Sequence, residues 1–109
     1  MALIDMDYMM GSGVNIKFDT LTATSSFQNI TVNRDIKYAV VIYDLDNGQT
    51  FIMEYNQGTY YDTYIRTSNP IRREVMADPS QFITVNGNTL SIKLGGTSWN
   101  ANVEYTIIY

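Results

Sequence analysis

Hydrophobic and polar residues alternate along most of this chain, with the two-residue period of a half-buried β-strand. The alternation is clear at 14–18, where Val14, Ile16 and Phe18 fall on one side, and from Val103 to Tyr109. Further predicted strands lie at 27–32, 36–44, 49–55, 59–66, 81–85 and 89–94. About eight short strands at roughly ten-residue spacing are typical of an antiparallel β-sandwich, immunoglobulin-like or jelly-roll. We therefore predict an all-β fold.

Two hairpins are predicted from turn residues. Asn47-Gly48 suits a two-residue type I′ turn, and this loop pairs Tyr43 with Ile52 and Ile42 with Met53. On that register the core face collects Ile36, Tyr38, Val40, Ile42, Phe51, Met53 and Tyr55. A second hairpin, around Asn86-Gly87-Asn88, places Ile83 and Val85 opposite Leu90 and Ile92.

The opposite face of the first hairpin carries Val41, Tyr43 and Ile52. Apolar side chains in the middle of a face argue against full exposure to water. These three residues are therefore predicted to contact a partner.

At most one short helix is expected, near 70–77. Ser68 or Asn69 provides an N-cap and Pro70 suits the first turn. The helix would end before Pro79, which cannot continue it.

The chain divides into an N-terminal arm, residues 1–13, and a single domain, residues 14–109. The arm ends in Gly11-Ser12-Gly13, a flexible spacer, and its Ile4, Met6 and Tyr8 alternate with Asp5 and Asp7. Such a strand can add to the sheet edge of a neighbouring subunit. The alternatives are a frayed terminus and a strand that pairs within its own domain.

Composition removes several classes of function. The 109 residues include no His and no Cys, so thiol catalysis, thiolate metal sites and the commonest general base are excluded. Net charge is −4 and only Arg72 and Arg73 are adjacent basic residues, which argues against nucleic-acid binding. From the residues given we expect no signal peptide and no membrane-spanning stretch.

The spacing of residues in this chain also does not match known catalytic or metal-binding motifs. Asp44-Leu45-Asp46-Asn47-Gly48 resembles the start of a calcium loop, but Gly48 occupies the position of a required oxygen ligand. The glycines form neither a phosphate loop nor a nucleophile elbow. We expect no cofactor, no metal and no enzymatic activity.

Nine tyrosines are many for this length, and several share one strand face with charged residues. That face and a Trp form a predicted ligand surface, suited to a glycan or to a protein: Tyr60, Asp62, Tyr64, Arg66 and Trp99. The alternative is that these tyrosines are present because tyrosine is favourable in strands, with the hydroxyl exposed to solvent.

In its overall composition and strand pattern the chain resembles the small virion proteins of tailed bacteriophages. The features are a detachable arm before Gly11-Ser12-Gly13, a body rich in Tyr, Asn and Thr, and a last strand that runs to Tyr109. The resemblance implies a structural component of a capsid, neck, tail or fibre, synthesised in a host cytoplasm and located in the virion. Its partners would be further copies of itself or other virion proteins. A glycan-binding or receptor-binding module is the alternative function.

Overall fold

The computed structural model describes residues 14–44, 50–65, 72–76, 78–94 and 101–109; the predicted arm, 1–13, lies outside them. The described residues form an antiparallel β-sandwich, which confirms the predicted fold class. The elements are β1 (Ile16–Ala23), β2 (Gln28–Thr31), β3 (Tyr38–Asp44), β4 (Thr50–Asn56), β5 (Thr59–Ile65), β6 (Arg72–Val75), the 3₁₀ turn η1 (Pro79–Gln81), β7 (Ile83–Asn86), β8 (Thr89–Ile92) and β9 (Ala101–Ile108).

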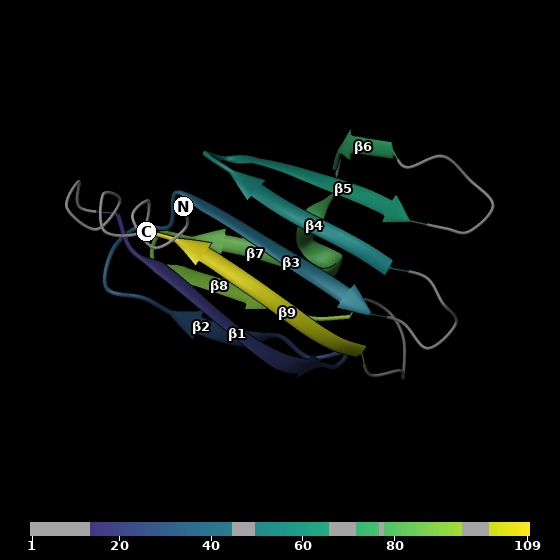
Figure 1. Cartoon of the computed structure of the whole chain (residues 1–109), viewed down its shortest axis with the longest axis horizontal. Coiled ribbons are helices and arrows are strands. Elements are labelled where there is room, and N and C mark those ends of the chain that lie inside the picture. Colours follow the sequence, from purple (N-terminus) through teal and green to yellow (C-terminus); the bar gives the residue numbers. More distant parts are fainter. Residues whose placement is uncertain (1–13, 45–49, 66–71, 77, 95–100) are drawn as a thin grey trace, which may run out of the picture.

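Two sheets form the layers of the sandwich (Figure 1). The large sheet has the strand order β1-β9-β3-β4-β5-β6, and the small sheet has the order β2-β8-β7. In Figure 1, β5 and β6 lie on one side of the molecule, away from β1 and β2. The large sheet therefore ends at β1 on one edge and at β6 on the other.

The core lies between the inner face of the large sheet and the small sheet. Strand β9 shows the alternation best, since Ala101, Val103, Tyr105 and Ile107 are buried while Asn102 and Glu104 are exposed. Apolar burial of this kind supplies the main favourable free energy of folding, about 25 cal/mol per Å². The remaining buried core residues are Ala23, Val32, Ile36, Ala39, Val41, Tyr43, Met53, Ile83, Leu90, Ile92 and Leu94.

The second predicted hairpin is confirmed, because Ile83 pairs with Ile92 and Val85 with Leu90. The turn from β4 to β5 consists of Gln57 and Gly58, whose φ angles are 49° and 96°. Positive φ at both central residues matches a type I′ turn, whose twist suits the flanking strands.

The predicted register of the first hairpin is wrong by one residue. Ile42, not Tyr43, pairs with Ile52, and residues 45–49 connect Asp44 to Thr50. A shift of one residue moves every side chain of one strand to the other face. Thus Met53 of β4 is in the core as predicted, but the core face of β3 carries Ala39, Val41 and Tyr43 instead of Tyr38, Val40 and Ile42.

The predicted helix near 70–77 is also wrong. Residues Arg72–Val75 form β6, which pairs with β5 at the edge of the large sheet. The helical turn occurs later, at Pro79–Gln81, where the Asp78 carboxylate accepts a hydrogen bond from the N–H of Ser80. A free strand edge offered the 72–75 backbone a ladder of hydrogen bonds, which local capping signals do not reveal.

Candidate functional site

The outer face of the large sheet lies opposite the core, and no described element covers it. Cross-strand pairing places Ile16 beside Ile108 and Ile108 beside Tyr38 on this face. In the next row Phe18 and Val40 flank Thr106, and the Phe18 side chain is 65% exposed. We call these five apolar residues over β1, β9 and β3 the outer patch: Ile16, Phe18, Tyr38, Val40 and Ile108. A contiguous exposed apolar patch marks an interaction surface more often than a scattered apolar side chain does.

Strand β1 carries part of the outer patch and is an edge of the large sheet, since β9 is the only described strand that pairs with it. Asn15 and Tyr109 exchange both backbone hydrogen bonds, at 2.6 and 2.9 Å. Hydrogen-bonded pairs alternate along an antiparallel ladder, so Lys17 and Asp19 also bond to β9. The N–H and C=O groups of the alternate residues, Ile16, Phe18, Thr20 and Thr22, therefore point to the open side.

Two backbone groups on this open side have local partners. The Thr20 N–H donates to Oδ1 of Asp19 at 2.8 Å, and the side-chain amide of Gln28 donates to the C=O of Thr22. The Gln28 contact closes the edge at its Thr22 end. Among the described residues, no strand pairs with the outer side of the stretch from Ile16 to Thr20. The other edge strands of the two described sheets, β2, β6 and β7, have four residues each.

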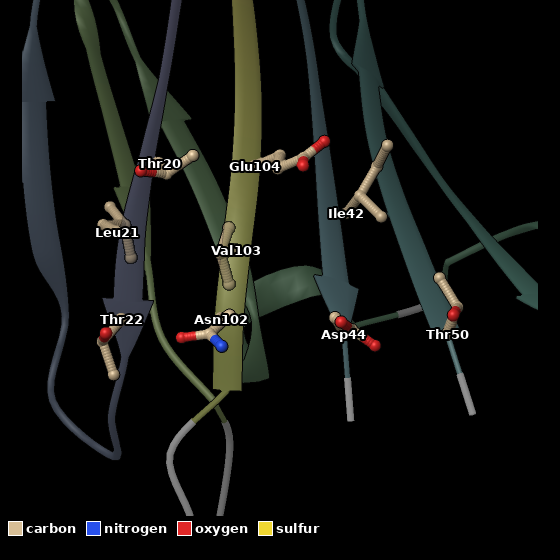
Figure 2. Close-up of a pocket in the computed structure, with 9 residues that line it drawn as sticks. All are labelled: Thr20, Leu21, Thr22, Ile42, Asp44, Thr50, Asn102, Val103 and Glu104. Carbon is tan, nitrogen blue, oxygen red and sulfur yellow. The ribbon is translucent and has the colours of Figure 1, made fainter. Parts of the chain in front are cut away.

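A hollow of about 610 Å³ lies at the opposite end of the outer face (Figure 2). One polar row crosses four strands there, because Thr22 pairs with Asn102, Asn102 with Asp44, and Asp44 with Thr50. Thr20, Glu104 and Ile42 lie beside this row. The lining therefore offers hydroxyls, an amide and two carboxylates next to three aliphatic residues, Leu21, Ile42 and Val103.

Charges on the β4–β6 part of the outer face pair with each other. Nε and Nη2 of Arg73 donate to the two carboxylate oxygens of Glu54 at 2.9 and 3.1 Å, and the guanidinium lies 3.7 Å from the centre of the Tyr61 ring. The hydrogen bonds from Arg73 lower the pKa of Glu54. Partial burial of the Glu54 carboxylate acts in the opposite direction but has a smaller effect. Partial burial and the Glu54 carboxylate raise the pKa of Tyr38, whose hydroxyl hydrogen-bonds to that carboxylate. These groups are internally satisfied, so the patch over β1, β9 and β3 is the better candidate for a contact.

Two of the three residues predicted to contact a partner through a covered face belong to the core. Val41 and Tyr43 are 0% exposed, and burial raises the pKa of the Tyr43 hydroxyl. That part of the prediction is wrong because it followed from the incorrect register. Ile52 does lie on the outer face, beside Ile42.

The predicted tyrosine surface is partly a structural contact between the sheets. The Tyr60 hydroxyl accepts a hydrogen bond from the Val85 N–H at 2.8 Å, which joins β5 to β7. Asp62 lies directly opposite Glu74 of β6, and its pKa is raised mainly by partial burial and then by that second carboxylate. Tyr64 pairs with Phe51 through the backbone. The other predicted residues, Arg66, Trp99, Ile4, Met6 and Tyr8, lie outside the described residues.

Sequence reasoning missed the open edge. The alternation of Ile16 and Phe18 was visible, but edge position depends on strand order, which a single strand does not report. Within the described ranges no group of three acidic residues is arranged to hold a metal ion.

Comparisons with known proteins found no match: no family model, no curated protein and no solved structure matches this chain. Among the described residues, no helix has the length and apolarity to cross a bilayer.

Proposed function

We propose that this chain is a non-catalytic structural protein that assembles with further copies of itself. The observation that carries the proposal is the outer patch beside the open edge of β1. An exposed Phe on a strand edge that no described strand covers favours association, because both sheet extension and apolar burial then act at one place. A second copy is the occupant that we propose for this surface.

The setting that we propose is the virion of a tailed bacteriophage, where the protein would contact neighbouring virion proteins as well. Support comes from the resemblance, described above, of this sequence to the small virion proteins of tailed bacteriophages. It also comes from the open edge, since an assembled particle supplies neighbours that cover it.

The native mass of the purified protein tests the proposal. Light scattering behind a sizing column, over a range of concentrations, should give a multiple of the 12.4 kDa protomer. Phe18→Ser should lower that mass. Phe27→Ser is the matched control, because Phe27 is 41% exposed but precedes β2 of the small sheet. A monomer at every concentration would overturn the proposal.

The N-terminal arm is a second contact that we propose. Fully extended, 13 residues span about 45 Å, more than the 41 Å long dimension of the molecule. An arm of this length can therefore reach a neighbouring subunit. Removal of residues 1–13 should weaken association; if mass and concentration dependence stay unchanged, the arm has no such role.

Glycan binding is the second candidate function, and the hollow favours it. Its hydroxyl, amide and carboxylate groups match the hydrogen-bonding needs of a neutral saccharide, and Ile42 offers an apolar contact. A panel of neutral oligosaccharides, followed by NMR, should shift resonances of Thr22, Asn102 and Asp44. Asp44→Asn should abolish these shifts, while Asp62→Asn should leave them. No shifts across the panel would reject this candidate.

A further inference from the structure

We propose that two copies pair edge to edge through β1. The strands run antiparallel about a twofold axis at Phe18, so that the two large sheets form one continuous sheet. This inference rests on the proposed self-assembly and specifies its interface and register.

The backbone restricts the alignment. The groups available on the open edge belong to the even-numbered residues Ile16, Phe18 and Thr20, whereas Lys17 and Asp19 bond to β9. An antiparallel ladder needs residues with outward-facing groups opposite each other. A twofold axis centred on a residue satisfies this need, and an axis between two residues does not. The Gln28 contact at Thr22 confines the centre of the ladder to the segment from Ile16 to Thr20.

Charge then selects among the remaining alignments. An axis at Lys17 places Lys17 opposite its copy, and an axis at Asp19 places Asp19 opposite its copy. Like charges directly opposite destabilise a strand pair. Among the five axes from Ile16 to Thr20, only an axis at Phe18 places Lys17 opposite Asp19 of the second copy, twice by symmetry. Lys17 and Asp19 then form pairs of the non-hydrogen-bonded type, in which facing side chains approach most closely.

The same alignment covers the most exposed residue of the edge. Phe18, 65% exposed in one copy, lies directly opposite Phe18 of the second copy, on the outer face. The two outer patches thereby become continuous. The Asp19 carboxylate, which now accepts from the Thr20 N–H, is released to Lys17 of the partner, and the Thr20 N–H becomes available to the ladder.

Disulfide cross-linking tests the register, because the chain has no Cys of its own. Residues in a hydrogen-bonded antiparallel pair have Cα atoms about 5.5 Å apart, within the range that a disulfide needs. Under a mild oxidant, the Phe18→Cys variant should become a covalent dimer on a non-reducing gel. Thr20→Cys is the matched control: its two copies would be roughly 14 Å apart in this register, too far to bridge.

Charge exchange provides a second readout that does not alter Phe18. Asp19→Lys alone should weaken dimerisation by roughly ten-fold, because two like-charge pairs replace two opposite pairs. The double variant Lys17→Asp, Asp19→Lys should restore the dimer. Circular dichroism checks that each variant is folded.

The outcomes separate this inference from the proposed function. A wild-type monomer at all concentrations overturns both. An oligomer that Phe18→Cys does not cross-link, or that Thr20→Cys cross-links equally, overturns the proposed β1 pairing at Phe18 and leaves self-assembly in place. Cross-linking of Phe18→Cys only after removal of residues 1–13 shows that the arm occupies β1, and this also overturns the inference.

Discussion

The hydroxyl of Tyr43 donates a hydrogen bond to the backbone carbonyl of Phe82 at 2.8 Å, and the two rings pack edge to face at 5.9 Å. The carbonyl of Lys93 lies 3.1 Å from the same hydroxyl. A fully buried tyrosine of β3 thus holds the segment after η1 and the end of the small sheet against the large sheet.

Removal of the Tyr43 hydroxyl should destabilise the fold without changing its shape. Tyr43→Phe leaves a buried carbonyl with one partner fewer, at an expected cost of about 1–2 kcal/mol in the free energy of unfolding. Urea denaturation measures this value. Tyr55→Phe is the control, since the Tyr55 ring packs against Tyr60 without a hydrogen bond from its hydroxyl in the described residues. Equal effects of the two variants would contradict the role of the Tyr43 hydroxyl.

Tyr60→Phe should act on stability. The change removes the acceptor of the Val85 N–H, and an unsatisfied backbone donor costs about 1–2 kcal/mol. Thermal unfolding should show a lower midpoint, while saccharide titrations and native mass stay as in the wild type. If the variant instead keeps wild-type stability but loses saccharide binding or assembly, the structural role of Tyr60 is contradicted and Tyr60 belongs to a functional surface.

The ion pair of Glu54 with Arg73 should make stability pH-dependent. The folded-state pKa of Glu54 lies below its usual value of 4.5. Its stabilisation is therefore present above about pH 4.5 and is lost as the pH falls through the lowered pKa. The difference in stability between wild type and Glu54→Gln should be small, because the pair lies at the surface. It should shrink from pH 7 to pH 3 and with added salt.

Glu104→Gln is the matched control for this prediction. Glu104 lies on the same face but makes no ion pair with the described residues. Its substitution should give no comparable dependence of stability on added salt. A Glu54→Gln difference that is constant with pH would contradict the prediction.

Asp62→Asn should stabilise the protein at neutral pH. The folded-state pKa of Asp62 is raised above its usual value of 3.8 by partial burial and by Glu74 directly opposite. The ionised form is thus disfavoured in the fold, a cost present above the folded-state pKa and absent at pH values below about 3.8. We expect a gain of about 0.2–1 kcal/mol at pH 7. Thermal unfolding at pH 7 and at pH 3 should show the gain only at pH 7.

Gln57 is a further target for stabilisation. Its φ of 49° is the one positive value at a non-glycine position among the described residues. Gln57→Asn places a residue that tolerates this conformation in the type I′ turn, with an expected gain of about 1 kcal/mol. Gly58→Ala is the opposing control: no atom lies within 4 Å of the added Cβ, yet φ is 96°. Chemical denaturation should show the first variant as more stable and the second as less stable.

The sequence alone determined the class of fold and the pairing of the β7–β8 hairpin. Alternation predicted strands over most of their observed lengths, and the turn residues around Gly87 placed Ile83 opposite Ile92. Both signals are local, since side-chain period and turn chemistry act within a few residues. They also identified Ile16 and Phe18 as one face of a strand.

Only the tertiary structure decided which faces and edges are open. Strand β3 is apolar on both faces, so its pattern alone did not choose between Val41 and Ile42 for the core; the pairing with β4 and β9 made that choice. Arg72–Val75 became a strand because β5 offered a free edge. The open edge at β1 follows from the order of the described strands, in which β1 pairs with β9 on one side and with no strand on the other. Strand order depends on contacts between residues far apart in the chain, so a pattern read over a few residues does not contain it.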